Sequence, residues 1–583
     1  MSRTHVSGPE PAPVSNTDHV PGRVWAHADK EPDQPILAVA RDDGSWQEFT
    51  WSELARQVRS VAAGLVSRGV APGDRVAIMS PTRMEWTVAD LAILSAGAVT
   101  VPIYDTSSPD QCRHILQDAD AALTFAATAE LADRVEEAGQ KNVIVFDDGG
   151  LDELFEDGDG DAETEVDRRQ SQISLDDVAT IVYTSGTTGD PKGCVLTHRN
   201  LAWTIRQTRI HFDEVIGGGG NLLHFLPLAH IFARVIQFVC LDAGLRVGYP
   251  RSMDELREDL NSFQPTFLLG VPRVFEKFFE TAKRQATGVR KPVFQFAVSA
   301  AHDWAEAENP GPWSRARRAL ADRLVYRQMQ AALGGRANYC VSGGAPLSRD
   351  LGLFFLAAGV PVLEGYGLTE TTAPAAVNTP SQLRIGTVGK PLPGVEIRID
   401  DGEVLVKGGN VFAGYHNRED SDFDGEWYRT GDLGELDDDG YLTLKDRKKE
   451  LIVTASGKNV VPTPLEEEVA DHDLVAQAML VGDQKKFVAA LITLDDDGLR
   501  EFAERHKLSG DIHELRHDDR VRDEVQRAID EANRHVSRAE SIRKFVIVDR
   551  QFSEDEGELT PTLKLRRRDI AEHFSDEIES IYA

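Results

Sequence analysis

Residues 181–193, Ile-Val-Tyr-Thr-Ser-Gly-Thr-Thr-Gly-Asp-Pro-Lys-Gly, join a short apolar run to a loop of hydroxyl groups and glycines that ends in a lysine. Glycine lets backbone N–H groups approach anionic oxygens closely, hydroxyl groups donate further hydrogen bonds, and the ammonium group of Lys192 supplies a positive charge. The chemistry therefore predicts a loop that binds a polyphosphate. It is not a Walker A loop, because Pro191 precedes the lysine and the apolar residues 194–196 predict a second strand instead of a helix.

The sequence before this loop has the rhythm of an α/β fold. Between about residues 24 and 125, helical patterns at 51–69 and 83–96 alternate with β-branched runs at 75–79 and 98–103. Such alternation predicts βαβ units around a parallel sheet. The expected fold class is therefore α/β.

After the phosphate loop, the predicted secondary structure changes twice along the chain. A second α/β region runs from about 177 to 379 and is interrupted by four glycines, 217–220, which predict a turn. Short strands between Gly and Asp turns at 386–444 predict a small β-barrel or sheet, and strands mixed with charged helices after Lys449 predict a small α+β domain. The acidic stretch 147–167 is expected to be a surface loop.

Composition argues against several classes of protein. Among the 583 residues, 64 Lys and Arg stand against 96 Asp and Glu, so the formal charge of -32 disfavours nucleic acid or an anionic membrane as a non-specific partner. The four cysteines lack metal-ligand spacing, which argues against a disulfide framework or structural zinc and favours the reducing cytoplasm. The start of the chain has no apolar core like that of a signal peptide, and the apolar stretch 86–104 contains Asp90. Any membrane contact is therefore expected to be peripheral.

Six further segments form an ordered series with the phosphate loop. They are 225–230 (Phe-Leu-Pro-Leu-Ala-His), 341–346 (Val-Ser-Gly-Gly-Ala-Pro), 364–371 (Glu-Gly-Tyr-Gly-Leu-Thr-Glu-Thr), 428–434 (Tyr-Arg-Thr-Gly-Asp-Leu-Gly), 446–452 (Asp-Arg-Lys-Lys-Glu-Leu-Ile) and 559–565 (Leu-Thr-Pro-Thr-Leu-Lys-Leu). In this order the segments resemble the motifs of the adenylate-forming superfamily, which contains acyl-CoA synthetases, luciferases and nonribosomal peptide adenylation domains. The resemblance spans nearly the whole chain, and an ordered series is far rarer by chance than one motif.

The resemblance implies an N-terminal adenylation domain, residues 1–448, made of two α/β subdomains and a small β-barrel, followed by a small mobile α+β domain, residues 449–583. It implies ATP and Mg²⁺ as ligands, with Thr184 and Glu370 as oxygen ligands of the metal. Coenzyme A is the implied co-substrate. The residues implied to bind ATP or to serve the coenzyme A step are Thr184, Ser185, Gly186, Thr187, Thr188, Lys192, Gly343, Gly344, Ala345, Glu364, Gly365, Tyr366, Gly367, Thr369, Asp432, Arg447, Lys449, Gly457 and Lys458.

Several individual roles also follow from the resemblance. Tyr366 is implied to stack on adenine, Thr369 to bond the α-phosphate, and Asp432 to accept hydrogen bonds from both ribose hydroxyl groups. Arg447 is implied to lie near ribose and phosphate, and Lys449 at the hinge between the domains.

Four residues are implied to be catalytic: Lys564, Thr184, Glu370 and His230. His230 is implied to lie beside the substrate carboxylate, and the charge of Lys564 to offset the negative charge that builds up between the carboxylate and the α-phosphate. The sequence departs from the family pattern at two places. Val453 stands where members often carry a lysine, so that contact is absent or supplied by Lys458, and the segment that ends in Lys564 lacks the usual preceding glycine.

The implied reaction is ATP-dependent conversion of a fatty acid to acyl-AMP and then to acyl-CoA, with release of AMP and pyrophosphate. Residues 270–277 and a long helical insert at 284–333 resemble long-chain acyl-CoA synthetases, so we expect a long-chain fatty acid–CoA ligase. Arginines in the insert accompany apolar residues at helical spacing. That pattern fits a membrane surface, and it fits a solvated helix face equally well.

Three alternatives stay open at this point. A fatty acyl-AMP ligase would deliver the acyl group to a carrier protein instead of coenzyme A. A phosphotransferase or ATPase would release ADP. A catalytically silent acyl-binding relative would do neither, although the presence of Lys564, Glu370 and Thr184 speaks against it. A homodimer is compatible with the sequence, which leaves the oligomeric state and the acyl chain length undecided.

Overall fold

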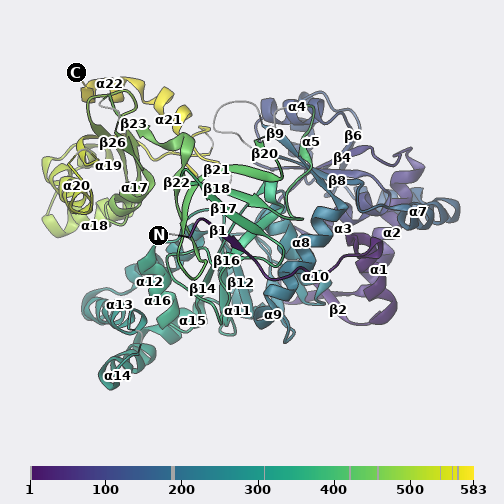
Figure 1. Cartoon of the computed structure of the whole chain (residues 1–583), viewed down its shortest axis with the longest axis horizontal. Helices are drawn as coiled ribbons and strands as arrows, with labels where there is room; N and C mark the ends of the chain where they lie inside the picture. Colours follow the sequence, from purple (N-terminus) through teal and green to yellow (C-terminus); the bar gives the residue numbers. More distant parts are fainter. Residues whose placement is uncertain are drawn as a thin grey trace. The chain divides into compact units, whose positions relative to one another are not determined.

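The computed structural model describes residues 3–184, 191–307, 309–418, 422–455, 458–538, 540–554, 556–560 and 564–582. The chain divides into two compact units (Figure 1). The first consists of Met1–Asp400, Leu405–Thr430 and Glu435–Thr443, and the second of Asp401–Val404, Gly431–Gly434 and Leu444–Ala583.

A seven-stranded sheet of the first unit carries the phosphate-loop segment, with the strand order β19-β9-β8-β5-β4-β6-β7 (Figure 1). The strands β4 to β8 run parallel, as predicted, whereas β9 and β19 join antiparallel. Thr184 ends β8 opposite Lys192 at the start of β9, so the predicted loop does join two strands. The strands are β4 (Arg75–Met79), β5 (Val99–Ile103), β6 (Ala121–Ala126), β7 (Val143–Val145), β8 (Val178–Thr184), β9 (Lys192–Thr197) and β19 (Gly414–Tyr415).

The two predicted helices that flank β4 are present as α2 (Trp51–Ser67) and α3 (Met84–Ser95). α2 begins where it does because Thr50 and Glu53 cap it reciprocally: the Thr50 N–H donates to Glu53 Oε2 at 2.8 Å, and the Glu53 N–H donates to Thr50 Oγ1 at 3.3 Å. α3 is buried along almost its whole length, as its apolar sequence predicts.

The acidic stretch 147–167 is not a surface loop, so this prediction was wrong. It forms helices α6 (Gly150–Asp157) and α7 (Gly160–Gln172), which pack against α2. Leu154 and Val166 are fully buried, and the Asp159 side chain caps α7 by accepting two backbone hydrogen bonds. The acidic residues occupy the solvent face of amphipathic helices, and acidic content alone does not distinguish such a face from a loop.

The second α/β region forms a nine-stranded sheet with the order β16-β15-β14-β13-β12-β10-β11-β2-β3. The six strands from β14 to β2 are parallel, and the three outer ones join antiparallel. The predicted glycine turn is confirmed, because Gly219 and Gly220 have φ of +76° and +153° immediately before β10. The strands are β2 (Pro35–Ala40), β3 (Trp46–Thr50), β10 (Asn221–Leu223), β11 (Arg246–Tyr249), β12 (Phe267–Gly270), β13 (Tyr339–Ser342), β14 (Val362–Leu368), β15 (Ala373–Val377) and β16 (Lys390–Pro391).

Residues 386–444 contribute most of a third sheet of six strands, in agreement with the predicted barrel or sheet. Its order is β1-β17-β18-β21-β20, with β22 paired to β21. The strands are β1 (His5–Ser7), β17 (Glu396–Asp400), β18 (Glu403–Lys407), β20 (Phe423–Asp424), β21 (Trp427–Leu436) and β22 (Leu442–Arg447). Further helices of the first unit are α1 (Val20–Lys30), α4 (Pro109–Asp118), α5 (Ala129–Glu137), α8 (His198–His211), α9 (Asp213–Ile216), α10 (Ile231–Asp242) and α11 (Leu256–Phe263).

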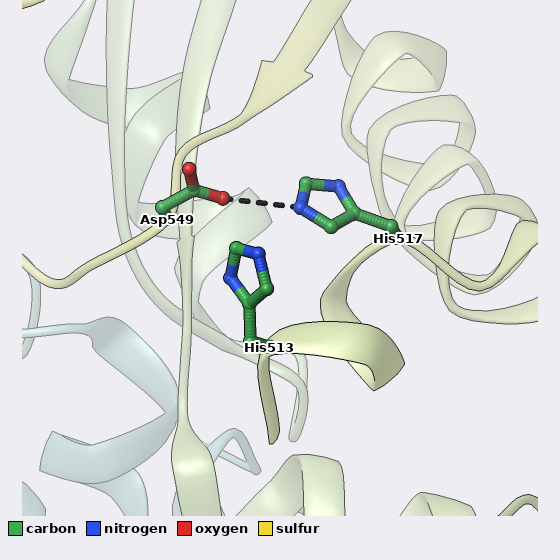
Figure 2. Close-up of side chains that lie close together, drawn as sticks. All are labelled: His513, His517 and Asp549. Atoms are coloured by element: carbon green, nitrogen blue, oxygen red, sulfur yellow. Dashed lines mark ion pairs between the residues drawn. The ribbon is translucent and has the colours of Figure 1, made fainter. Parts of the chain in front are cut away.

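The second unit is a small α+β structure, as predicted. In its three-stranded sheet, β25 pairs antiparallel and β27 parallel with the central β26, whose alternate residues enter two hydrophobic clusters. Figure 2 shows three side chains of this unit that lie close together: His513 of α19, His517 just after α19, and Asp549 just after β27. The elements are β23 (Ile452–Val453), β24 (Asn459–Val460), β25 (Val475–Val481), β26 (Val488–Leu494), β27 (Ile542–Ile547), α17 (Thr463–Ala470), α18 (Asp496–His506), α19 (Ile512–Arg516), α20 (Asp519–Ala532), α21 (Arg567–His573) and α22 (Ser575–Tyr582).

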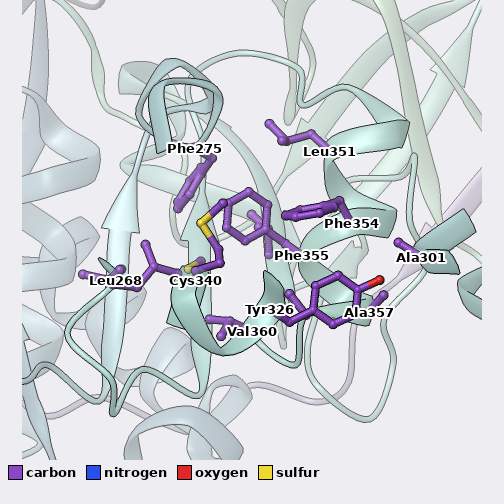
Figure 3. Packing of buried hydrophobic residues seen from close by; sticks show 14 of the residues in the cluster. Leu268, Phe275, Ala301, Tyr326, Cys340, Leu351, Phe354, Phe355, Ala357 and Val360 are labelled. Carbon is purple, nitrogen blue, oxygen red and sulfur yellow. The ribbon is translucent and has the colours of Figure 1, made fainter. Parts of the chain in front are cut away.

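The predicted helical insert packs on the nine-stranded sheet through an aromatic core (Figure 3). The Phe354 ring meets the rings of Phe279 and Tyr326 edge to face at 4.9 and 5.7 Å, and the buried Tyr326 hydroxyl donates to the Ala297 carbonyl at 2.7 Å. None of the helices in the described ranges is long and apolar enough to cross a membrane. The insert 284–333 contains α13 (Lys291–Ala305), α14 (Pro312–Ala321), a π-helical turn (Asp322–Tyr326) and α15 (Arg327–Ala332), and it is flanked by α12 (Pro272–Gln285) and α16 (Arg349–Ala357).

Candidate active site

The end of β8 and the start of β9 hold the two ends of the predicted phosphate loop. Of the loop residues, Ser185, Gly186, Thr187 and Thr188 lie outside the described part of the chain. Lys192 is half-buried, and its Nζ lies 4.9 Å from the centre of the Tyr415 ring, a cation–π contact. The lysine is therefore held at the end of the loop before any ligand binds.

Tyr415 is a residue that the sequence analysis missed. It lies on β19, which pairs with β9, and its hydroxyl donates to Glu370 Oε1 at 2.8 Å and lies 3.2 Å from the Tyr428 hydroxyl. Burial and then the charge of Glu370 raise the pKa of Tyr415 far above its usual range, so it stays a donor. Tyr415 therefore contacts both Lys192 and Glu370. No sequence motif around Gly414 predicts these contacts.

The two predicted magnesium ligands, Thr184 and Glu370, converge on the thiol of Cys194. Cys194 lies on β9, and its thiol is close enough to Thr184 and Glu370 for both side chains to act on its pKa. Burial and then the charge of Glu370 raise the pKa of Cys194 well above its usual value, so the thiol stays neutral. A hydroxyl and a half-buried carboxylate are oxygen donors of the type that Mg²⁺ prefers, so the residues present fit this metal.

The strand predicted to contact adenine is β14. Tyr366 is buried, and Gly367 is needed because a Cβ there would come within 2.1 Å of the Ala373 carbonyl oxygen. Thr369 and Glu370 follow in a short 3₁₀ turn, Thr369–Thr371. Gly365 is half-buried on the same strand.

The glycines after β13 form the second predicted wall of the nucleotide site. A Cβ at Gly343 would lie 3.1 Å from the Phe232 ring, and Gly344 has a φ of +87°, which favours glycine. Ala345, next to them, is exposed. The bare backbone at Gly343 lets the Phe232 ring pack directly against this turn.

Glu364, at the head of the β14 motif, is buried next to this wall. Burial raises the pKa of its carboxyl group to about 7, although the backbone N–H groups of Leu347 and Gly386 oppose the shift by donating hydrogen bonds. The folded protein therefore holds a proton on Glu364 over a pH range in which the unfolded chain has lost it.

A Glu364→Gln variant is expected to resist rising pH better than the unmodified protein. Between pH 4.5 and about 7 the native state binds the extra proton, so ionisation of Glu364 destabilises it progressively, by up to about 3 kcal/mol at 1.36 kcal/mol per pH unit. Urea unfolding of both proteins from pH 5 to 8 measures this. A stability difference that does not change with pH would contradict the buried-carboxyl account.

His230 occupies the N-cap of α10 and is half-buried. Its Nδ1 accepts a hydrogen bond from the Phe232 N–H at 3.2 Å, so the neutral ring carries its proton on Nε2. The structure thus gives His230 a capping role, and it defines Nε2–H as the group that would face a substrate carboxylate.

A buried ion pair between Arg234 and Asp90 connects the elements that carry His230 and Thr184. The sequence analysis singled out Asp90 but not Arg234. Arg234 of α10 donates to both carboxylate oxygens of Asp90 on α3, at 2.8 and 2.5 Å, and to Thr180 Oγ1 on β8 at 2.7 Å. Both charged side chains are fully buried, and Thr100 Oγ1 also donates to Asp90 at 2.8 Å. The pair links the helix capped by His230 to the strand that ends at Thr184.

In the second unit, two predicted nucleotide ligands contact each other. Asp432 is buried, and its Oδ1 lies 3.2 Å from Arg447 Nε. Lys448 pairs with Glu403 at 3.1 Å, whereas Lys449, the predicted hinge residue, is exposed. The two side chains predicted to bind near the ribose therefore form an ion pair with each other in this unit.

Lys564 belongs to the same electrostatic neighbourhood. Its backbone N–H donates to Thr560 Oγ1 at 3.0 Å, which closes the predicted lysine loop, although residues 561–563 lie outside the described ranges. Lys564 is exposed by surface area, yet desolvation by surrounding protein atoms lowers its pKa to about 8, with Arg447 lowering it and Asp432 raising it. The ammonium group therefore remains mostly protonated at neutral pH.

The predicted coenzyme A loop is only partly described. Lys458 is exposed, and its Nζ pairs with Glu540 Oε1 at 3.1 Å. Gly457 lies outside the described residues.

Comparison with known families identifies the class of protein. A family model described as AMP-binding enzyme matches residues 24–416, and one described as the AMP-binding enzyme C-terminal domain matches residues 449–583. The chain belongs to the AMP-binding enzymes, the adenylate-forming family that the motif series resembles.

Curated relatives match over almost the full chain. A long-chain-fatty-acid–CoA ligase, FadD15, of Mycobacterium bovis is 45% identical and covers 99% of both chains, and its Mycobacterium tuberculosis counterpart is 44% identical with the same coverage. The long-chain-fatty-acid–CoA ligase ACSBG1 of Homo sapiens is 30% identical, over 95% of this chain and 84% of its own.

Solved structures share the fold. O-succinylbenzoate coenzyme A synthetase from Bacillus subtilis, solved with ATP and a magnesium ion, has a TM-score of 0.68 at 23% identity, and the alignment covers 94% of this chain and 98% of that one. The adenylation domain of a carboxylate reductase from Mycobacterium chelonae has a TM-score of 0.73 at 22% identity, covering 97% and 91%. These likenesses confirm the predicted α/β fold with a large N-terminal and a small C-terminal part.

Proposed function

We propose that the protein is an AMP-forming long-chain fatty acid–CoA ligase, which activates a long-chain fatty acid with ATP and transfers the acyl group to coenzyme A. The observation that carries the proposal is the convergence of Thr184, Lys192 and Glu370 on Cys194 and Tyr415, at the ends of the strands that flank the phosphate loop. The names of the full-length relatives at 45% and 44% identity support the acyl and acceptor substrates.

In the first half-reaction, a carboxylate oxygen attacks the α-phosphorus of ATP, and the bond to the leaving pyrophosphate breaks. No general base is needed, because a carboxylic acid is already ionised at neutral pH. Thr184 and Glu370 would hold Mg²⁺, which when bound neutralises phosphate charge. Lys192 attracts the polyphosphate, His230 Nε2–H orients the carboxylate, and Lys564 stabilises the charge that builds up at the α-phosphate.

In the second half-reaction, the coenzyme A sulfur attacks the carbonyl carbon of acyl-AMP, and AMP leaves with the electron pair of the broken C–O bond. We propose a division into residues 1–448 and 449–583, with rotation about Lys449 between the half-reactions. That rotation would exchange Lys564 for the loop that contains Gly457 and Lys458. Such an exchange lets one set of ligand contacts serve two reactions.

The acceptor is tested by offering coenzyme A and a phosphopantetheinylated acyl carrier protein in parallel, with ATP, Mg²⁺ and fatty acids of increasing length. The proposal expects acyl-CoA as the thioester product, with the highest kcat/KM for long chains. Accumulation of acyl-AMP with coenzyme A, and thioester only on the carrier protein, would establish the acyl-AMP ligase alternative. A higher kcat/KM for short-chain acids would overturn the proposed long-chain substrate but not the proposed acceptor.

We further propose a cytoplasmic enzyme whose membrane contact, where fatty acids partition, is peripheral and uses α14. Trp313, Leu320 and Leu324 on α14 and the following turn are 77%, 51% and 42% exposed, and Arg315 and Arg323 beside them are exposed. An exposed apolar face bordered by arginines suits the interface of an anionic bilayer. Assembly as a homodimer is tested separately by light scattering.

Trp313→Ser is expected to lower binding to anionic phospholipid vesicles by about ten-fold or more, because a large apolar side chain buried in the interface contributes about 1.5–3 kcal/mol and each 1.4 kcal/mol is a factor of ten. Vesicle flotation measures the bound fraction. Met253→Ser, at another exposed apolar side chain (62%), is the matched control and should leave binding unchanged. Equal binding by both variants would exclude α14 as the contact.

A further inference from the structure

Two histidines and an aspartate converge on the surface of the second unit, away from every motif assigned above (Figure 2). One ligand atom from each of His513, His517 and Asp549 lies within 4.8 Å of the other two. Within the described ranges, this is the one group of three His, Cys, Asp or Glu side chains with such spacing. The cluster is exposed, so an ion would reach it directly from solvent.

Local structure brings the three side chains together. α19 begins at an Asp511 cap, whose side chain accepts from the Glu514 N–H at 2.9 Å. His513 lies in the first turn of α19, and His517 is the C-cap residue that follows its end. Asp549 follows the end of β27 by two residues. The cluster therefore connects a short helix to the sheet of the same unit.

The geometry is close to that of a metal site. His517 Nε2 lies 3.3 Å from Asp549 Oδ1, and the two imidazole rings are 5.1 Å apart at 87° to each other. Tetrahedral Zn²⁺ with bonds of about 2.0–2.2 Å places its ligand atoms about 3.4 Å apart. One pair already has this separation, and rotation of exposed side chains brings in the third.

The two arginines next to the cluster in the sequence form ion pairs with other carboxylates and not with Asp549. Arg516 and Arg550, adjacent to the cluster in sequence, pair with Asp496 at 2.6 Å and Glu558 at 2.6 Å. The four cysteines, the other strong zinc ligands, are all buried and far apart in the sequence. Among the residues that the structure describes, this His₂Asp cluster is thus the one exposed donor set suited to a borderline transition metal.

We propose that His513, His517 and Asp549 form a surface site for Zn²⁺, with water in the remaining position. Two imidazoles select zinc and similar transition metals over Mg²⁺ or Ca²⁺, which prefer oxygen. The ion ties α19 to the segment after β27 and so stabilises the second unit, because it binds the folded site and not the unfolded chain. The site is independent of the proposed ligase activity.

The test is Zn²⁺ binding by the full chain, measured by competition with a chromophoric chelator in excess Mg²⁺, which occupies the oxygen sites. One equivalent of Zn²⁺ is expected to bind and to raise the unfolding temperature of the second unit. His513→Ala, His517→Ala and Asp549→Asn should each weaken binding by at least about ten-fold, the lower end of what even the loss of a supporting hydrogen bond costs a metal site.

His506→Ala, at an exposed histidine of α18 in the same unit, is the control and should bind Zn²⁺ like the unmodified protein. Circular dichroism verifies that each variant is folded, and Co²⁺ substitution should give a visible absorption band that the three ligand variants lose. Unchanged Zn²⁺ affinity in folded ligand variants, or no binding by the unmodified chain, would overturn the site. Ligase activity without Zn²⁺ should be the same in all variants, so the outcome does not depend on the proposed function.

Discussion

Lys564→Ala is expected to slow adenylation by about 10²–10³-fold, the effect of removing one preorganised positive donor from a charge-developing transition state. The ammonium group is available at neutral pH, because its pKa of about 8 still leaves most of it protonated. The transfer of preformed acyl-AMP to coenzyme A should proceed at nearly the normal rate, because the proposed role of Lys564 ends when pyrophosphate leaves. Pyrophosphate release and the isolated thioester step measure the two halves.

Two further variants test whether the charge at position 564 causes the loss of adenylation. Lys564→Arg keeps the charge and should retain part of the adenylation rate, and Lys486→Ala, at an exposed lysine of the same unit, should retain all of it. Equal loss in both half-reactions would mean that Lys564 supports the fold instead of the chemistry. Full adenylation by Lys564→Ala would remove the residue from the mechanism.

Asp90→Ala is expected to destabilise the first unit by about 3–5 kcal/mol, because it leaves the fully buried guanidinium group of Arg234 without its counter-ion. Such a loss is a large fraction of a typical domain stability of about 5–15 kcal/mol. Urea unfolding, followed by tryptophan fluorescence, measures the change. Adenylation should also fall in any folded fraction, because Arg234 joins the His230 helix to the strand that ends at Thr184.

The double variant Asp90→Leu/Arg234→Met separates charge from packing. It removes both charges and should recover most of the lost stability, since apolar replacement of a buried pair is often neutral. Arg500→Ala breaks the exposed pair with Asp497, where both side chains are more than half exposed, and should change stability by less than about 1 kcal/mol. A single Asp90→Ala variant as stable as Arg500→Ala would contradict the buried-pair account.

Strands such as β4 and the loop between β8 and β9 were predictable from the sequence. The periodicity of a strand and the glycines of a loop are both local signals. The strand predicted at 75–79 has the same bounds in β4, and the predicted loop after Thr184 joins β8 to β9. The helices at 150–172 were missed, because only their few buried positions, such as Leu154, distinguish them from an acidic loop.

The candidate site was predictable only as separate motifs. Thr184, Lys192 and Glu370 each lie in a recognisable segment, but Tyr415 and Cys194, which connect them, carry no motif of their own. Their roles depend on the antiparallel pairing of β9 with β8 and β19, a long-range feature that no local pattern encodes. The Arg234–Asp90 pair was hidden for the same reason, since its partners are 144 positions apart.

The central claim is that the acyl group passes through acyl-AMP on its way to coenzyme A. The most direct measurement supplies a long-chain fatty acid labelled with oxygen-18 in its carboxylate, together with ATP, Mg²⁺ and coenzyme A, and analyses the nucleotide product by mass spectrometry. The account predicts AMP that carries one labelled oxygen, with acyl-CoA and pyrophosphate formed in equal amounts. ADP as the nucleotide product, or AMP without label, would contradict it.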